Sequence, residues 1–137
     1  MKILIVKVSS LGDVVHALPI VADIRRARPD AVIDWVVEPA FAGIVGLVGG
    51  VRRVIPFALR RWRKQPFAAA TRAEVAGFWK LLRSERYDLV LDVQGLVKTA
   101  LVAAAAHGPV AGIGNRTDGS SYEQPVRWFY DHAIAIA

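Results

Sequence analysis

Short runs of apolar, β-branched residues alternate with stretches of helical periodicity along this chain, and this alternation restricts the fold more than any other feature. The apolar runs predict strands over 2–8, 31–37, 53–57, 89–93 and 110–113. Apolar residues recur at helical spacing over 13–28, 41–48, 69–84 and 96–106. Strands that alternate with helices imply right-handed crossovers and a parallel sheet covered on both faces. We therefore predict a single α/β domain over 1–137 with a Rossmann-like sheet.

Three local features refine this pattern. Pro19 predicts a kink or a delayed start in the first helix, because proline lacks a backbone donor. Polar residues over 115–124 predict a loop, and apolar residues follow over 128–136. The final stretch, 133–137, reads Ala-Ile-Ala-Ile-Ala with no polar cap. We interpret it as a cut inside a larger protein, with a terminal edge strand as the alternative.

Composition excludes several classes of protein. Hydrophobic residues make up 54% of the 137 residues, which argues against disorder. The chain has no cysteine, so disulfides and cysteine-based metal or redox chemistry are excluded, and a reducing cytoplasm fits. Lys7 interrupts the first apolar run before an export signal could form, and no apolar run is long enough to cross a membrane.

The net charge is +6, with a sequence pI near 10.2. An excess of this size indicates an anionic partner: nucleic acid, anionic lipid or a phosphorylated substrate. Composition alone leaves these alternatives open, so the position of the charges carries more information.

The first candidate motif runs from Lys7 to Asp13, where the first strand leads into a helix. Ser9, Ser10 and the free amides of a helix start can bind hydroxyl or phosphate oxygens. Gly12 permits a tight turn, Asp13 can accept a proton, and Lys7 can hold a negative charge. The motif lacks the three glycines of a dinucleotide site and the Gly-Lys-Ser/Thr of a P-loop. Helix capping is the alternative role of its serines and aspartate.

The second motif is a basic segment just after the third strand, expected to form a surface loop. It places four cations around Trp62: Arg60, Arg61, Arg63 and Lys64. Further arginines lie nearby in the sequence at positions 52, 53 and 72, and no acidic residue occurs over 39–73. We therefore expect this charge to be unpaired locally and to clamp phosphate or carboxylate groups, which arginine binds with two hydrogen bonds. Nucleic acid is the competing partner.

The third motif, over 92–98, follows the fourth strand. Gln94 can hydrogen-bond sugar hydroxyls, Gly95 allows close backbone approach, and Lys98 lies in the first turn of the next helix. The three histidines, at positions 16, 107 and 132, have no metal-ligand spacing. We expect the tryptophans at 35, 79 and 128 to be core or interface residues.

Together these motifs resemble the lipopolysaccharide heptosyltransferase I family of glycosyltransferase family 9. The similar segments are Lys-Val-Ser-Ser-Leu-Gly-Asp-Val-Val-His-Ala-Leu-Pro at 7–19, Asp-Trp-Val-Val-Glu at 34–38, Val-Ile-Pro at 54–56, the basic segment at 60–64, and Asp-Val-Gln-Gly-Leu-Val-Lys at 92–98. These segments occur in order over nearly the whole chain. The resemblance implies the amino-terminal, acceptor-binding half of a two-domain GT-B architecture, with the donor-binding domain absent from this chain.

The resemblance also implies an activity. Members of this family are inverting transferases that move L-glycero-D-manno-heptose from ADP-heptose to the first Kdo of Kdo2-lipid A. Asp13 matches their catalytic base, and the basic segment matches the part that grips the acceptor. The expected substrate-binding residues are Lys7, Ser9, Ser10, Gly12, Arg60, Arg61, Arg63, Lys64, Gln94 and Lys98.

The resemblance implies no metal and no cofactor other than the donor. It implies a cytoplasmic protein, peripheral on the anionic inner membrane surface, that binds no nucleic acid. One departure from the family is that Glu-Gln-Pro stands at 123–125, where many members have Arg-Glu-Pro. Arg116 or Arg127 is the candidate replacement for that arginine. The alternatives to a transferase are a non-catalytic module for nucleic acid or anionic membrane, and an oxidoreductase, which the missing glycine fingerprint disfavours.

Overall fold

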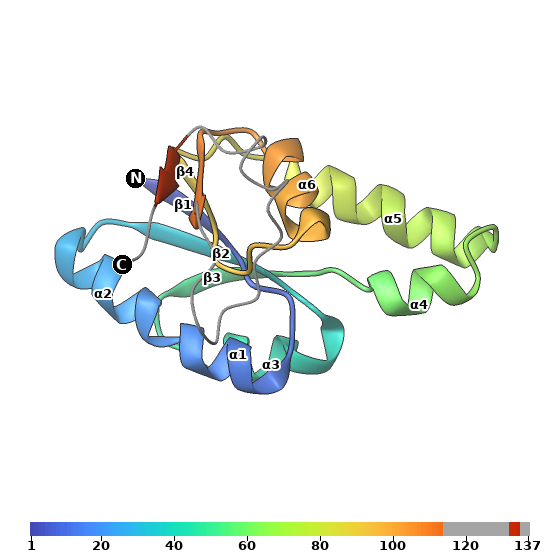
Figure 1. Ribbon diagram of the computed structural model, residues 1–137, viewed down its shortest axis with the longest axis horizontal. Coiled ribbons are helices and arrows are strands. Elements are labelled where there is room, and N and C mark those ends of the chain that lie inside the picture. Colours follow the sequence, from blue (N-terminus) through green and yellow to red (C-terminus); the bar gives the residue numbers. More distant parts are fainter. Residues whose placement is uncertain (114–131, 135–137) are drawn as a thin grey trace.

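A computed structural model describes residues 1–113 and 132–134 of the chain (Figure 1). Within these residues six strands form one sheet in the order β3-β2-β1-β4-β5-β6, and every neighbouring pair is parallel. The strands are β1 (Lys2–Val6), β2 (Val32–Val37), β3 (Val51–Pro56), β4 (Leu89–Asp92), β5 (Val110–Ile113) and β6 (His132–Ile134). The predicted Rossmann-like sheet is confirmed.

β1 lies at the centre of the sheet because it pairs on both sides. Ile3 aligns with Ile33 of β2 and with Leu89 of β4. At the far edge, β6 aligns His132 with Ala111 of β5. The backbone of residues 132–134 thus adopts the edge strand that the apolar carboxyl-terminal sequence left as an alternative.

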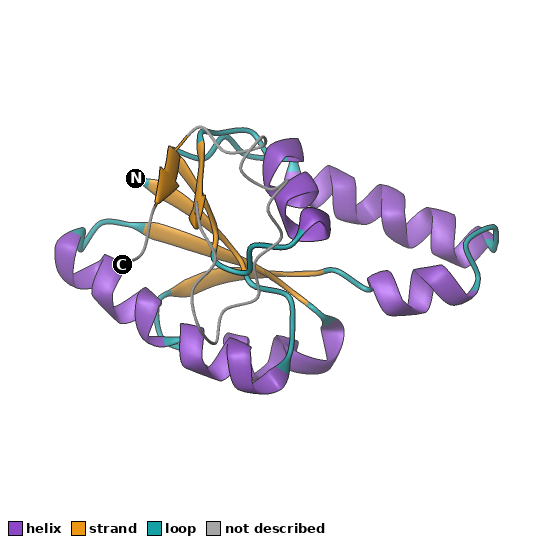
Figure 2. Ribbon diagram, viewed as in Figure 1, coloured by secondary structure: helices purple, strands orange, loops and turns teal. Residues whose placement is uncertain are grey.

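Helices cover both faces of the sheet (Figure 2). They are α1 (Leu11–Ala17), α2 (Pro19–Ala27), the 3₁₀ turn η1 (Pro39–Phe41), α3 (Ala42–Gly46), α4 (Leu59–Lys64), α5 (Ala69–Leu82) and α6 (Val97–Ala105). The first three α-helices cover one face, while α5 and α6 cover the other (Figure 1). No helix within the described ranges is long and apolar enough to cross a bilayer.

The two faces of the sheet bury separate cores. Along β1, Ile3 and Ile5 join the core under α1, α2 and α3, while Leu4 and Val6 join the core under α5 and α6. All four side chains are 3% exposed or less. Successive residues of a strand point to opposite faces, so a strand covered by helices on both sides must be apolar throughout. This explains the uninterrupted apolar run that predicted β1.

The long helix expected over 13–28 is divided. Leu18 ends α1 and precedes Pro19, which occupies the first position of α2. Proline is tolerated there because the first amides of a helix have no partner within it. The break expected at Pro19 is therefore confirmed.

The basic segment is a helix and not the expected surface loop. Residues 59–64 form α4, which turns back into α5, and the two helices project from the sheet as a hairpin that we call the α4–α5 arm (Figure 1). The ring centroid of Trp62 lies 5.6 Å from that of Phe57 and 5.7 Å from that of Phe78. Trp62 Nε1 also donates a hydrogen bond to Glu74 Oε2 at 3.0 Å. Burial of Trp62 makes this segment helical, because helical geometry points the indole inward.

Candidate functional site at the carboxyl edge of the sheet

The turns after β1 and β4 meet at the carboxyl edge of the sheet, where parallel α/β folds bind ligands. Val6 aligns with Asp92, so residues 7–10 lie beside residues 93–96. The fold therefore brings the first and third sequence motifs into one site.

Gln94 joins these two turns. Its side chain is 4% exposed, and its Oε1 accepts hydrogen bonds from the amides of Val8 at 2.8 Å and Ser9 at 3.3 Å. Its Nε2 donates to Ser9 Oγ at 3.4 Å. These bonds give Gln94 a positioning role that the sequence did not reveal. Direct contact between Gln94 and a sugar hydroxyl stays a prediction.

Asp92 shapes the turn after β4. Its Oδ1 accepts hydrogen bonds from the amides of Gln94 at 3.1 Å and Gly95 at 3.2 Å, and Thr99 Oγ1 donates to Oδ2 at 3.3 Å. Gly95 has a φ of +76°, a conformation that favours glycine. The glycine thus serves the turn geometry, and Lys98 follows in the first turn of α6, as predicted.

Asp13 is exposed in the first turn of α1, beside the end of β1. Its Oδ2 accepts from the amide of Ser10 at 3.3 Å and from Ser10 Oγ at 3.2 Å. Helix capping is therefore one real role of this carboxylate. The other oxygen, Oδ1, takes no part in either bond, so capping and proton transfer are compatible.

Lys7 puts a cation beside this carboxylate. It is half-buried, and its Nζ donates to the carbonyl of Val93 at 3.3 Å. Burial lowers the pKa of Lys7, and the charges of Asp13 and Asp92 oppose part of that effect. A cation held in this position can stabilise a negative group that approaches Asp13.

Gly12 does not have the role expected of it. It lies inside α1 with an ordinary helical backbone, since the positive-φ glycines among the described residues are Gly50, Gly95 and Gly108. A Cβ placed on Gly12 would meet no atom within 4 Å. The tight turn that Gly12 was predicted to permit is not formed at this residue, which is helical, while backbone contact of Gly12 with a substrate stays a prediction.

The cations of α4 differ in their partners. Arg60 Nε lies 3.6 Å from Glu38 Oε1, and Arg61 forms an ion pair with Glu74. The expectation of locally unpaired charge is wrong for these two residues, because the fold brings acids from β2 and α5 to them. Arg63 and Lys64 are exposed and form no ion pair with the described residues.

Arg52 and Arg53 do not belong to the basic cluster at α4. They lie at the start of β3, at the opposite edge of the sheet, where Asp34 is fully buried. Arg52 Nη2 donates to Asp34 Oδ2 at 2.7 Å, Arg53 Nε donates to it at 3.1 Å, and Tyr87 Oη donates at 2.6 Å. Burial raises the pKa of Tyr87, and the Asp34 carboxylate raises it further. These two arginines are structural.

A groove of about 330 Å³ opens between α4, α5 and α6. Phe57, Trp62 and Phe78 form part of its apolar lining, and Arg63 and Lys98 bring cations to it from two different helices. The fold therefore brings the second and third motifs together through this groove.

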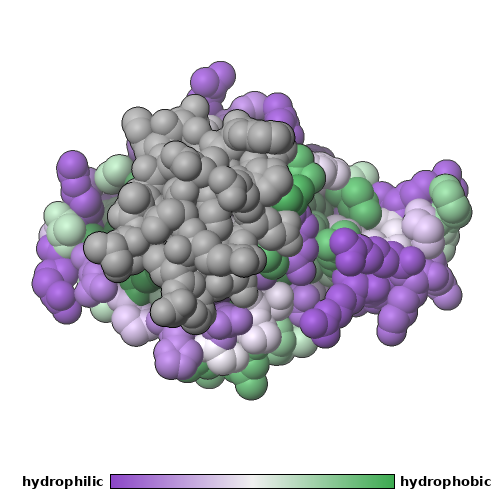
Figure 3. Space-filling view, viewed as in Figure 1, coloured by the Kyte–Doolittle hydropathy of each residue, from purple (hydrophilic) through white to green (hydrophobic). Residues whose placement is uncertain are grey.

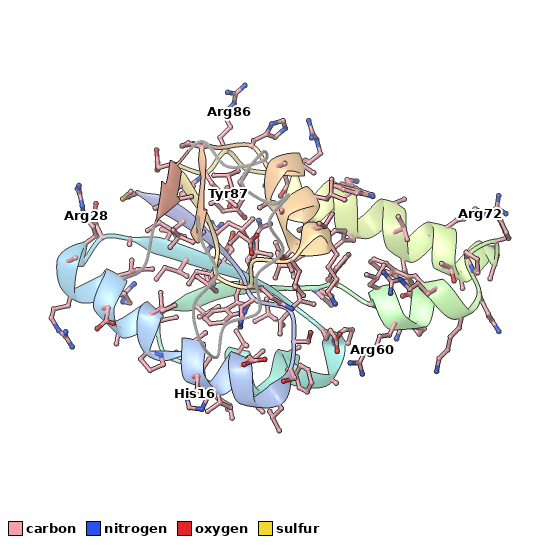
Figure 4. All side chains as sticks on the ribbon, in the orientation of Figure 1. His16, Arg28, Arg60, Arg72, Arg86 and Tyr87 are labelled. Carbon is pink, nitrogen blue, oxygen red and sulfur yellow. The ribbon has the colours of Figure 1, made fainter. Side chains whose placement is uncertain are left out.

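Glu38 is a site residue that the sequence did not single out. It is 7% exposed at the end of β2 and lines a second cavity, of about 230 Å³, together with Arg60 and Arg61. Arg60 extends from α4 toward this region (Figure 4). The sequence could have indicated Glu38, because a carboxylate directly after a strand lies at the carboxyl edge of a parallel sheet.

Some of the remaining predictions concern residues that the structure describes, and others do not. Trp35 is fully buried, as expected, and Trp79 is 39% exposed beside the groove. The expected arginine replacements at 116 and 127, the 123–125 motif, the 115–124 loop and Trp128 lie outside the described residues.

Comparisons with known proteins agree with one another. The model of glycosyltransferase family 9 (heptosyltransferase) matches residues 75–137. Lipopolysaccharide heptosyltransferase 1 of Escherichia coli K12 is 50% identical over 139 aligned residues, which cover 100% of this chain and 42% of that protein. The corresponding protein of Pseudomonas aeruginosa is 44% identical, with 100% of this chain and 38% of the relative covered.

A solved structure, E. coli heptosyltransferase WaaC with ADP, matches with a TM-score of 0.93 and 44% identity, over 100% of this chain and 42% of WaaC. WaaC with ADP-2-deoxy-2-fluoro heptose gives a TM-score of 0.91. The chain therefore spans about two fifths of the length of these relatives. Its fold is that of the amino-terminal part of a GT-B glycosyltransferase, as predicted.

Proposed function

Because this chain belongs to glycosyltransferase family 9, we propose that it forms the acceptor-binding half of an inverting heptosyltransferase. The reaction moves L-glycero-D-manno-heptose from ADP-heptose to the Kdo of Kdo2-lipid A in the synthesis of the lipopolysaccharide inner core. One observation carries the proposal: a domain with the fold of WaaC presents an exposed carboxylate, Asp13, beside a cation, Lys7, at the carboxyl edge of its sheet.

In the proposed reaction Asp13 is the catalytic base. The acceptor hydroxyl attacks the anomeric carbon from the face opposite the nucleotide, the bond from that carbon to ADP breaks, and Asp13 takes the hydroxyl proton. The hydrogen bonds from Ser10 fix the orientation of the carboxylate. Gln94 fixes the backbone that precedes it, so Gln94 positions the base through the turn.

The acceptor-binding group in this proposal consists of the cations around the groove. Arg63, Lys64 and Lys98 bind the carboxylates of Kdo and the phosphates of lipid A, for which arginine and lysine are suited. Arg60 and Arg61 already form ion pairs with Glu38 and Glu74, so they would contact the acceptor while they stay paired with these carboxylates. Lys7, Ser9, Ser10 and Gly12 complete the proposed site near the base.

The donor is proposed to bind mainly in the part of the protein beyond this domain, which itself corresponds to 42% of the length of WaaC. WaaC itself has been solved with ADP and with a fluorinated ADP-heptose, which supports a nucleotide-sugar donor. Bond formation requires the reacting atoms within about 3–3.5 Å of one another. The 137 residues supply the base and the acceptor cations, and no cofactor beyond the donor is invoked. We therefore expect the isolated chain to fold and to bind acceptor fragments weakly, without transferring heptose.

The proposal also places the protein in the cytoplasm, in peripheral contact with the inner membrane that carries the acceptor. The net charge of +6 and the exposed cations of α4 support attraction to an anionic surface. Nucleic acid is not favoured, since the similarity to heptosyltransferases covers the whole chain.

A transfer assay tests this function directly. The complete protein is incubated with ADP-heptose and a soluble Kdo2-lipid A analogue, and the isolated residues 1–137 are assayed in parallel. We expect turnover by the complete protein and none by the isolated chain. Calorimetry should show weak acceptor binding and no tight donor binding for the isolated chain. Turnover by residues 1–137, or donor binding as tight as in the complete protein, would overturn the proposed division of labour.

A further inference from the structure

The tip of the α4–α5 arm is apolar and exposed. It consists of residues 65–70, between the last residue of α4 and the first turn of α5. Phe67 is 89% exposed there, and Pro66, Ala69 and Ala70 are also exposed. A group of exposed apolar residues with a polar rim is typical of an interaction surface, whereas a single exposed side chain such as Leu47 is not.

Cations surround this tip. Arg63 and Lys64 precede it at the end of α4, and Arg72 follows it in α5; all three are exposed. Arg72 lies at the far end of the arm (Figure 4). None of the three forms an ion pair with a described residue, and no acidic residue occurs over 39–73. In the space-filling view hydrophilic residues cover the α4 side of the arm, and hydrophobic residues appear at its far end (Figure 3).

The packing at the base of the arm holds the tip away from the sheet. Trp62 is 7% exposed and packs edge-on against Phe57 and Phe78. Its indole also donates to Glu74, which ties α4 to α5. With the two helices joined this way, Phe67 cannot fold back onto the core under α5 and α6 without breaking these contacts.

We propose that Phe67 inserts into the interface of an anionic bilayer while Arg63, Lys64 and Arg72 bind lipid phosphates at the surface. An aromatic ring flanked by cations matches the boundary between headgroups and acyl chains. Single-stranded nucleic acid fits less well, because its bases stack on several aromatic side chains along a groove and this tip carries one. The inference gives a structural basis to the membrane contact proposed above and does not depend on the transferase reaction.

The position of the arm gives this contact a consequence for the site. α4 starts three residues after β3 ends, so the arm is attached at the carboxyl edge that holds Asp13. An arm anchored in the bilayer would hold that edge close to a lipid-borne acceptor. Arg63 then lies between the membrane-binding tip and the proposed acceptor site, since it also lines the groove.

Vesicle binding with matched variants tests the proposal. Phe67→Ser is compared with Leu47→Ser, because Leu47 is 88% exposed at the end of α3, away from the arm. In co-sedimentation with phosphatidylcholine vesicles containing phosphatidylglycerol, we expect Phe67→Ser to weaken binding about tenfold, as the loss of one inserted aromatic ring implies. Leu47→Ser should bind like the unmodified chain. Equal binding by all three proteins would overturn the proposal.

Fluorescent labelling distinguishes insertion from surface attraction. The chain has no cysteine, so Phe67→Cys and Leu47→Cys each accept a single environment-sensitive dye. We expect a blue shift of the dye at position 67 on anionic vesicles, none at position 47, and none on pure phosphatidylcholine. Binding without a shift at position 67 would mean electrostatic adsorption alone and would overturn the insertion.

Two further measurements separate this inference from other outcomes. A short oligonucleotide that binds tightly through Phe67 while anionic vesicles do not would also overturn it, in favour of nucleic acid. Transfer to a soluble acceptor by the complete protein should be unchanged in Phe67→Ser. Failure of transfer in the unmodified protein would instead contradict the proposed function and leave the vesicle result intact.

Discussion

Cations lie at both ends of β3, and the two groups differ in whether acidic side chains contact them. At the start of the strand Arg52 and Arg53 contact the fully buried carboxylate of Asp34. After the end of the strand Arg63 and Lys64 are exposed, with no ion pair to a described residue. The two clusters are about ten residues apart in the sequence and look alike there.

The difference lies in the partners that distant elements supply. β2 carries Asp34 to the first cluster, and the segment that follows α5 carries Glu85 to it, so its charges are neutralised within the fold. Among the described residues, no acid forms an ion pair with Arg63 or Lys64 of α4. Charge that the fold neutralises stabilises the domain, whereas charge that it leaves exposed is available to a ligand. The following predictions test this division, beginning with the largest effect.

Asp13→Asn tests the carboxyl edge most strongly. In the complete protein the substitution keeps size and hydrogen bonding but removes the base, so we expect turnover to fall roughly 10²-fold or more. Because Asp13 is exposed, the free energy of unfolding should change by less than about 1 kcal/mol. Steady-state kinetics and chemical denaturation measure both, with Asp23→Asn on α2 as the control. Turnover within a few-fold of the control would show that Asp13 is a helix cap alone.

Asp34→Asn tests the opposite edge. Removing one partner of a buried ion pair costs several kcal/mol, but both arginines are partly exposed and can regain water, so we expect a loss of about 2 kcal/mol. Acceptor binding by the folded variant should be unchanged. Urea denaturation and calorimetry measure these effects. A stable variant with weakened acceptor binding would reverse the assignment of the two clusters.

The pH dependence of stability follows from the same carboxylate. Burial acts to raise the pKa of Asp34, but hydrogen bonds from Arg52 and Tyr87 and the arginine charges outweigh it and lower the pKa. A depressed folded-state pKa stabilises the domain above the unfolded value, about 3.9, and this contribution is lost as the pH falls below it. Stability should therefore drop on acidification, and less steeply in Asp34→Asn, as denaturation at several pH values would show.

Replacing Arg60, Arg63 and Lys64 with alanine tests the exposed cluster. We expect acceptor binding to weaken about tenfold and its salt dependence to decrease, since exposed charges contribute little each and are screened by salt. ADP-heptose binding should be largely spared. Titrations of both substrates at two salt concentrations measure this, with Arg26→Ala and Arg28→Ala on the other face as controls. Equal loss for both substrates would indicate general disruption.

Gly12→Ala should have the smallest effect. Its backbone is helical and a methyl group would meet no atom within 4 Å, so we expect stability to rise by less than about 1 kcal/mol. Thermal denaturation measures the change. A clear loss of stability would show that a side chain at position 12 is not tolerated.

Much of the fold could be predicted from the sequence, because its signals are local. Strands buried on both faces are continuous apolar runs, and Pro19 marks the helix break by its own chemistry. The helical form of residues 59–64 was missed because four of these six side chains carry charge and the segment is too short for an apolar periodicity. The helix is stabilised by the packing of Trp62 against Phe57 and Phe78, and a local sequence pattern does not reveal these contacts.

For the candidate site, the positions of several residues in the fold could be predicted, but their contacts could not. Asp13, Lys7 and Lys98 lie where strands end, as the parallel sheet requires. The role of Gln94 could not be foreseen, because its partners Val8 and Ser9 lie 86 and 85 positions away in the sequence, respectively. Such contacts depend on strand order, which the sequence did not specify.

The central position of β1 has a consequence for synthesis of the chain. β1 is synthesised before its neighbours and gains β2 early, yet its other neighbour, β4, begins at Leu89. Until that segment emerges, one side of β1 has open backbone donors and acceptors, and pairings this distant in sequence close slowly. A nascent chain paused before residue 89 would therefore present a half-built sheet. Such an intermediate is where a chaperone would have most to protect.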